Sequence, residues 1–154
     1  MKQRIYVDTS VIGGCEDEEF SKWSLRLFQE FHQGFKIAVI SDITRRELEG
    51  APENVKKALL NIPDANLENV NLIEESETLS WKYIDERVVS VRYIIDAQHI
   101  AIASVERVDV LVSWNFQHIV NLDRIRAFNS VNLKLGFPIL DIRSPREVIH
   151  EKEI

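Results

Sequence analysis

Three acidic side chains and one amide stand where a parallel α/β sheet would bring them together. Asp8 and Asn115 each follow a short apolar run that predicts a buried strand, and Glu47 lies about two helical turns beyond a third such run. Asp96 stands in the first turn of the most apolar segment of the chain. Because ligands of open parallel sheets bind outside the carboxyl ends of the strands, we expect these four side chains to converge on one cleft.

Carboxylates held this close repel one another, and burial makes their charged forms less favourable. A proton or a divalent cation offsets the repulsion, and hard oxygen ligands favour Mg²⁺ or Mn²⁺. Such a cation can orient a water molecule, lower its pKa and stabilise charge on a phosphoryl oxygen. The pattern therefore indicates a metal site suited to phosphodiester chemistry.

The segments that would position these groups are short apolar runs that alternate with helical patterns. The runs are apolar throughout, which is typical of strands buried on both faces. Strands and helices alternating in this way predict a three-layer α/β/α fold with a mainly parallel central sheet. The expected strands are residues 5–7, 35–40, 70–73 at an edge, 108–112 and 137–142.

Helix boundaries follow from capping residues and apolar spacing. Ser21 is expected to cap a helix over residues 21–31, and Gly34 stands in the position favoured just past its end. The Gly pair at 13–14 predicts a flexible turn, whereas Ser144 begins a capping box that opens a short last helix. The other expected helices span residues 42–50, 53–61, 76–88, 94–105 and 118–135.

Length and composition are those of a soluble globular protein. The chain has 154 residues, which fits one domain over residues 1–154, and 45% of them are hydrophobic. Cys15 is the single cysteine, so an internal disulfide is impossible and a reducing, cytoplasmic location is expected. Every apolar run is too short for a signal sequence or a membrane span. The net charge of −6 argues against nucleic-acid binding through a broad basic face, but it permits a site where cations supply the positive charge.

Four segments resemble the motifs of PIN domains, in the order found in that family and across nearly the whole chain. Residues 6–12 resemble the opening motif, and residues 40–48 resemble the second, whose Glu is the functional acid. Residues 96–103 resemble the third motif, an Asp that opens an Ala-rich helix, and residues 111–118 resemble the fourth. The branch they are most similar to is the VapC-like toxins of bacterial and archaeal toxin–antitoxin pairs.

This resemblance implies a PIN-like fold and a ribonuclease that uses Mg²⁺ or Mn²⁺ to cleave structured RNA. It implies metal binding or orientation of the attacking water by three carboxylates: Asp8, Glu47 and Asp96. Asn115 takes the fourth position, where many members carry Asp; it keeps an oxygen but loses the charge, which should weaken a second metal site. The resemblance further implies that Thr9 and Ser113 hydrogen-bond the site carboxylates. A homodimer and a cognate antitoxin would be the partners.

Other polar and aromatic side chains have both a functional and an ordinary interpretation. Five basic or imidazole side chains are expected near the cleft. They could contact the substrate, or they could form surface salt bridges or be satisfied polar groups: Arg45, Arg46, Arg92, His99 and His118. Trp114 would stack on a base or pack at the rim of the cleft. Trp23, Phe28 and Phe31 favour the core or a dimer interface.

Two other functions compete with the nuclease. One is an inactive PIN-like module that binds an antitoxin or RNA without cutting, which Asn115 and the negative charge favour. The other is a phosphoryl-transfer enzyme or receiver domain on a similar sheet. Ser10 stands where a haloacid-dehalogenase pattern needs a second acid, and Val7 stands where a receiver domain needs one. A GxxxxGK[ST] phosphate loop is absent as well, which argues against hydrolysis of ATP or GTP.

Overall fold

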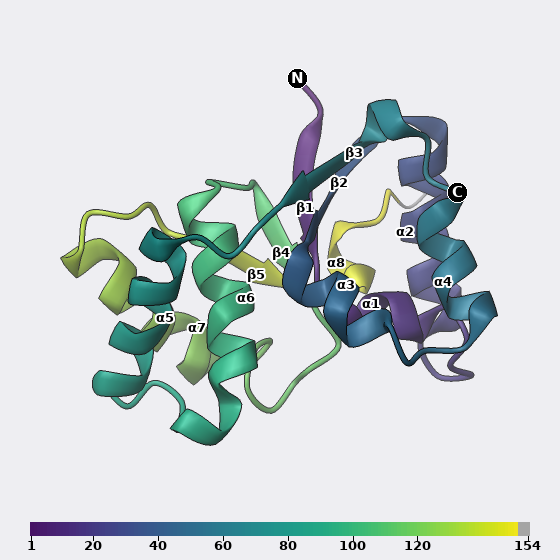
Figure 1. Ribbon diagram of the computed structural model, residues 1–154. Helices are drawn as coiled ribbons and strands as arrows, with labels where there is room; N and C mark the ends of the chain where they lie inside the picture. The colour runs from purple at the N-terminus through teal and green to yellow at the C-terminus, as the bar shows by residue number, and fades with distance from the viewer. Residues whose placement is uncertain (151–154) are drawn as a thin grey trace.

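The computed structural model describes residues 1–150 and has a five-stranded parallel sheet at its centre (Figure 1). The strand order is β3-β2-β1-β4-β5, and all four neighbouring pairs are parallel. The α/β fold predicted from the sequence is therefore confirmed. The strands are β1 Gln3–Val7, β2 Lys36–Ser41, β3 Leu67–Val70, β4 Val110–Val112 and β5 Asp141–Arg143.

Helices cover both faces of the sheet and complete the three layers. In Figure 1, α5, α6 and α7 lie on the left of the sheet, and α2 and α4 lie on the right. Two short 3₁₀ helices, η1 Asp64–Asn66 and η2 Val91–Tyr93, join the larger elements. The α-helices are α1 Thr9–Gly14, α2 Ser21–Gln33, α3 Asp42–Leu48, α4 Glu53–Leu60, α5 Glu74–Asp85, α6 Ile94–Val105, α7 Leu122–Lys134 and α8 Pro145–Val148.

Alternating side chains of the central strands divide the interior into two cores. Along β1, Ile5 and Val7 point into the core that α1, α2 and α4 cover, and Tyr6 points into the core beneath α5, α6 and α7. All three side chains are fully buried. A strand buried on both faces must be apolar along its whole length, which explains the uninterrupted apolar runs in the sequence.

The glycine pair at 13–14 is the clearest departure from the sequence-based prediction. It ends helix α1 instead of forming a flexible turn, so that prediction was wrong. A β-carbon on Gly14 would lie 2.6 Å from Ser24 Oγ and 2.8 Å from Trp114 Nε1. Glycine is needed here because α1 packs closely against its neighbours.

Several helices and strands begin or end at residues other than those predicted from the sequence. Helix α2 begins at Ser21 with Phe20 as its N-cap, so the predicted Ser21 cap was wrong. Helix α7 begins at Leu122 instead of 118, because Asn121 accepts hydrogen bonds from the backbone N–H groups of its first turn. The expected strands at 70–73, 108–112 and 137–142 lie at β3, β4 and β5 with other limits. The Gly34 cap, the Ser144 capping box and the limits of α6 are confirmed.

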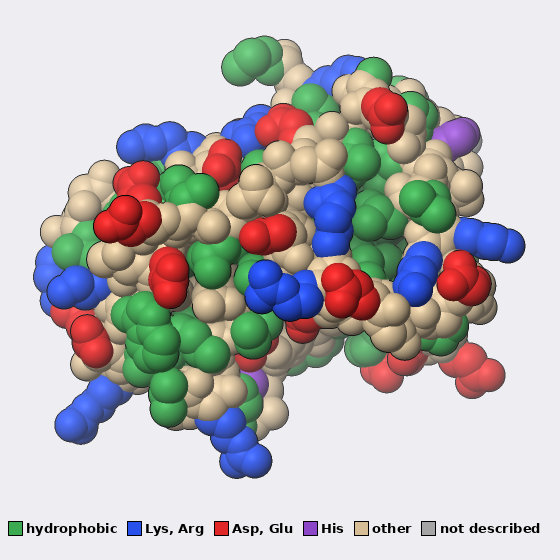
Figure 2. All heavy atoms as spheres, viewed as in Figure 1, with side chains coloured by type: hydrophobic (Ala, Val, Ile, Leu, Met, Phe, Trp, Pro, Cys, Tyr) green, Lys and Arg blue, Asp and Glu red, His purple; other side chains and the backbone are tan. Residues whose placement is uncertain are grey.

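The surface carries charges of both signs. Figure 2 shows basic and acidic side chains interspersed over the face it presents, in keeping with the net charge of −6. No helix in the described part of the chain is both long and apolar enough to cross a membrane.

We predict opposite effects for alanine at the two neighbouring glycines of α1. Gly14→Ala should lower the free energy of unfolding by about 1–3 kcal/mol, because the added methyl group overpacks the contact with Ser24 and Trp114. Gly13→Ala is the matched control: its β-carbon meets no atom within 4 Å, and replacing a helical glycine should leave stability unchanged or raise it by up to about 1 kcal/mol. Urea unfolding of both variants measures the difference, and equal stability would contradict the packing argument.

Candidate active site

The expected cleft lies where the order of the strands reverses. The chain runs outward from β1 to β2 and β3 on one side, then returns to place β4 and β5 on the other side of β1. Asp8 follows β1 directly, and its backbone N–H donates to the carbonyl of Val112, the last residue of β4, at 3.1 Å. Ser113 follows β4. Such a switch point at the carboxyl edge of a parallel sheet is where these folds bind ligands.

Asp8 is a buried carboxylate held by two hydroxyl groups. Asp8 is only 6% exposed. Asp8 Oδ2 accepts hydrogen bonds from Ser113 Oγ at 2.7 Å and from Ser10 Oγ at 2.8 Å. A buried charge requires such partners, because it has lost its contacts with water. The bond from Ser113 agrees with the sequence-based expectation, and the one from Ser10 was missed.

Glu47 reaches the same place from helix α3. Its Oε1 accepts hydrogen bonds from Thr9 Oγ1 at 2.7 Å and from His99 Nε2 at 2.8 Å. Burial alone would raise the pKa of the Glu47 carboxyl. The hydrogen bonds from His99 and Thr9 outweigh burial, so its pKa lies below the ordinary value. Glu47 is therefore a stable anion at neutral pH.

His99 stands at the centre of the acidic groups and is 1% exposed. Its Nε2 lies 3.4 Å from Asp8 Oδ1 as well as 2.8 Å from Glu47 Oε1. Burial lowers the pKa of His99, but the hydrogen bond to Glu47 and the charges of Asp8, Glu47 and Asp96 raise it further than burial lowers it. In the absence of a metal, the carboxylates around His99 thus raise its pKa and stabilise the charged imidazolium.

Tyr6 and Ser41 fix the orientation of the His99 ring from the core side. His99 Nδ1 lies 2.6 Å from the Tyr6 hydroxyl, and Tyr6 donates to Ser41 Oγ at 2.7 Å. Burial raises the pKa of Tyr6, so its hydroxyl keeps the proton that it donates to Ser41. The imidazolium can then donate from Nδ1 to the Tyr6 oxygen, which directs Nε2 at Glu47 and Asp8. An outer hydrogen bond of this kind is the usual support of a metal-binding histidine.

Asp96 and Asn115 form a second part of the site. Asn115 Nδ2 points at Asp96 Oδ2 at 3.4 Å, while its Oδ1 accepts from the backbone N–H groups of Gln117 at 3.2 Å and His118 at 3.0 Å. Both ends of the Asn115 amide are therefore engaged. Burial and the nearby charge of Asp8 raise the pKa of Asp96, against the opposing effect of His99 and His118. Asn115 thus orients Asp96, and its own oxygen holds a backbone turn.

The donor atoms at the centre of the site fit a divalent cation. One oxygen each from Asp8 and Glu47 and one nitrogen of His99 all lie within 4.8 Å of one another. Carboxylates suit Mg²⁺ and Mn²⁺, and an imidazole nitrogen shifts the preference from Mg²⁺ toward Mn²⁺ and other first-row metals. The sequence-based ligand set contained Asp96 in place of His99. Asp96 lies three residues earlier on α6, close enough for its charge to raise the pKa of His99.

The remaining candidate residues lie around this centre. Arg45 donates to the backbone carbonyl of Ile40 at 3.3 Å and contacts Asn69, while Arg46 and Arg92 are exposed. His118 is buried, with its ring 3.8 Å from that of Tyr93, and its Nδ1 has no hydrogen-bond partner within residues 1–150. His99 is buried, so its side chain lacks the exposed surface that a substrate contact would need.

No family model matches the sequence, and no curated protein matches it either. Thirteen chains of solved structures are similar in fold, and two of them serve as examples. The crystal structure of VapC20 from Mycobacterium tuberculosis, a sarcin–ricin loop cleaving toxin, gives a TM-score of 0.53 at 16% identity, covering 74% of this chain and 92% of that one. The structure of VapBC2 from Rickettsia felis, bound to a DNA fragment from the promoter, gives a TM-score of 0.57 at 13% identity, covering 92% of this chain and 98% of that one. At these identities the likeness shows the fold alone, which is PIN-like.

We predict that His99 titrates above the ordinary histidine value of about 6.5 in metal-free protein, and that Glu47→Gln lowers its midpoint. Because the pKa of His99 is raised on folding, protonated His99 stabilises the folded state. This contribution is complete below about pH 6.5 and is lost as pH rises through the folded-state pKa of His99. The lowered pKa of Glu47 makes stability depend on pH in the opposite direction. The stabilising contribution of Glu47 is lost as pH falls through the folded-state pKa. NMR of the imidazole resonances in EDTA measures the midpoint. Glu49→Gln, an exposed neighbour on the same segment, is the control, and an equal drop in both variants would contradict the pairing.

Asn115→Asp should place a second carboxylate against Asp96. The new side chain can still accept the two backbone hydrogen bonds, but it loses the amide N–H that faces Asp96 and adds a like charge. We expect a loss of about 1–2 kcal/mol of stability in EDTA at neutral pH, recovered on addition of Mn²⁺. Thermal unfolding with and without Mn²⁺ tests this. Asn121→Asp, which exchanges one good N-cap for another, should change little.

Proposed function

We propose that this protein is a metal-dependent endoribonuclease, and that it is the toxin of a toxin–antitoxin pair. The observation that carries the proposal is the convergence of Asp8, Glu47 and His99 at the switch point of a PIN-like sheet. These groups come from the end of β1, from α3 and from α6, so the fold has to bring them together. The four motifs that resemble those of PIN domains fall on the same segments.

The residues divide into those that hold a cation and those that act on water. Asp8, Glu47 and His99 would hold Mg²⁺ or Mn²⁺, with Asp96 as a further carboxylate beside them. The bound cation would orient a water molecule and offset charge on a phosphoryl oxygen. Asp96, a further carboxylate near this centre with a raised pKa, would take a proton from that water. The water oxygen would then bond to phosphorus as the bond to one sugar oxygen breaks, and the leaving oxygen would take up a proton from solvent.

RNA is the proposed substrate, and an antitoxin protein is the proposed partner. The likeness to a toxin that cleaves the sarcin–ricin loop supports the first, and the likeness to VapBC2 bound to promoter DNA supports the second. A homodimer in the cytoplasm, where Cys15 would stay reduced, completes the proposal.

A binding module without activity is the second candidate. It is favoured by the fourth motif, where the Asn115 oxygen holds backbone N–H groups and so adds no negative charge for a second cation. The two candidates differ in one observable, which is whether RNA is cut.

Purified protein should cleave a mixed, structured RNA in Mn²⁺ or Mg²⁺ but not in EDTA. Asp96→Asn should reduce the rate by at least about 100-fold, because it removes the proposed base while keeping the shape of the side chain. Asp64→Asn, an exposed acid in η1, is the matched control and should cleave like the wild type. Gel analysis of the RNA products measures the rates.

Mn²⁺ binding, measured by calorimetry, shows whether the proposed metal site is intact if no RNA is cut. Folded protein that binds Mn²⁺ through Asp8, Glu47 and His99 but leaves every RNA intact would favour the silent module. Cleavage that persists in EDTA, or that Asp96→Asn leaves unchanged, would refute the proposed chemistry.

A further inference from the structure

We propose that an aromatic pocket beside the candidate active site holds one unstacked base of the RNA, next to the phosphate that is cut. This inference rests on the proposed function for the identity of the nucleic acid. The pocket has a volume of about 680 Å³ and lies between the start of α2, the segment after β4 and helix α8. Its lining residues are Glu19, Phe20, Trp23, Trp114, Phe116, Ser144, Arg146 and Glu147.

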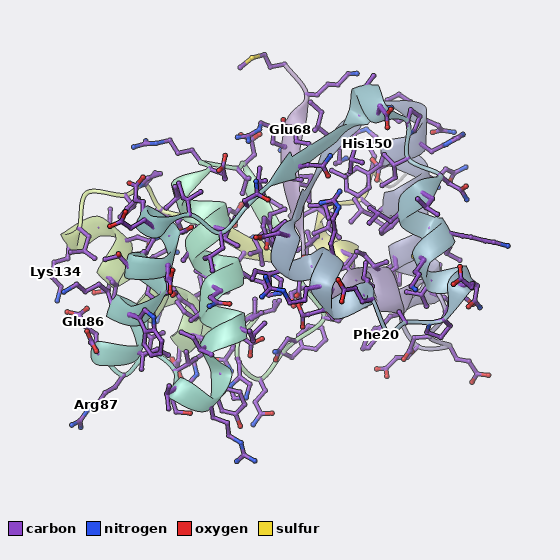
Figure 3. All side chains as sticks on the ribbon, viewed as in Figure 1. Phe20, Glu68, Glu86, Arg87, Lys134 and His150 are labelled. Carbon is purple, nitrogen blue, oxygen red and sulfur yellow. The ribbon has the colours of Figure 1, made fainter. Side chains whose placement is uncertain are left out.

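The floor of the pocket is a rigid aromatic pair. The rings of Phe20 and Trp114 stack at a centroid distance of 4.2 Å and an angle of 15°. Trp114 Nε1 donates to the buried Ser24 Oγ at 2.9 Å, and the close contact with Gly14 holds the indole from below. Phe20 lies near α1 at the lower right of Figure 3. A floor fixed by packing and by a hydrogen bond provides a flat surface at little conformational cost to a ligand.

The walls, in contrast, are open to solvent. Phe116 is 49% exposed, with its ring 6.4 Å from that of Phe20 and 6.1 Å from that of Trp114. Elsewhere in the lining, the Arg146 guanidinium lies 4.9 Å from the ring centroid of Trp23. Exposed aromatic rings and planar guanidinium groups are the surfaces on which proteins stack unpaired bases.

Two hydrogen bonds connect this pocket to the acidic centre. The backbone N–H of Trp114 donates to Ser10 Oγ at 2.9 Å, and Ser10 Oγ donates to Asp8 Oδ2 at 2.8 Å. Trp114 also stands between Ser113, which holds Asp8, and Asn115, which faces Asp96. Trp114 thus joins the pocket to the residues that hold Asp8 and face Asp96, and on this connection we place the base next to a phosphate bound at the acidic centre.

The charges in the pocket favour a base over a phosphate. Two carboxylates, Glu19 and Glu147, lie in its lining beside the one guanidinium of Arg146. Carboxylates repel phosphate, but they accept hydrogen bonds from the amino groups on base edges. A neutral, flat, aromatic ligand with polar edges matches this combination, whereas a second phosphate does not.

The test measures binding of a short single-stranded RNA to protein that carries Asp96→Asn, in Mn²⁺, so that the RNA stays intact. Adding Phe116→Ala should weaken binding about tenfold, since it removes an exposed stacking surface. Phe35→Ala is the matched control: that ring is 65% exposed but lies just before the start of β2, at the other end of the strand from the site. Phe116→Trp should restore binding.

An abasic scan of the same RNA gives the decisive comparison. One abasic position should weaken binding to the Asp96→Asn protein by a similar factor, and it should cause no further loss once Phe116 is alanine. In protein with an intact site, Phe116→Ala should raise KM more than it lowers kcat.

The outcomes separate this inference from the proposed function. RNA cleavage in which neither Phe116→Ala nor any abasic position matters would overturn the base pocket and leave the nuclease standing; a side chain of a protein partner would then be its occupant. Binding of RNA that depends on Phe116, without cleavage by the wild type, would support the pocket and overturn the nuclease. Failure to bind RNA at all would overturn both.

Discussion

The hydrogen bond between His99 and Glu47 is the contact on which the arrangement of the site depends. It joins α6 to α3 across the end of the sheet, and the same imidazole nitrogen lies 3.4 Å from Asp8 after β1. Without a positive charge at this point, the carboxylates of three separate segments would repel one another in a partly buried place. The core supports the contact from behind, through the Tyr6 hydroxyl and Ser41. A protonated His99 in the free protein, or a cation bound in its place, would meet the same requirement.

Residues that directly follow a strand were predictable from the sequence. Asp8 and Ser113 must lie at the carboxyl edge of a parallel sheet, whatever the details of packing, and the alternation of apolar runs with helices was enough to place them there. The part played by His99 was not predictable, because it depends on the rotation of α6 about its axis and on which face of β1 carries Tyr6. The helical turn at Gly14 was missed for a similar reason, since its close contacts with Ser24 and Trp114 come from segments distant in sequence.

Asn115 shows how one amide can serve two structural demands that a carboxylate serves less well. Its oxygen stabilises the turn before α7, and its nitrogen faces a carboxylate with a raised pKa. Aspartate would meet the first demand and oppose the second. The sequence indicated the loss of charge at this position, but only the geometry distinguishes an orienting side chain from a ligand.

The order of the strands also determines when the site can form during synthesis. Asp8 and the Ser113 hydroxyl that holds it are separated by 105 positions, and β1 lies between β2 and β4 in the sheet. A chain emerging from the ribosome can pair β1 with β2 early, but the cleft stays open along one side until β4 has been made. Contacts so distant in sequence form late in folding. A partly synthesised chain therefore carries Asp8 and Glu47 without the closed cleft between β1 and β4, and any activity of the site would begin only when synthesis is well advanced.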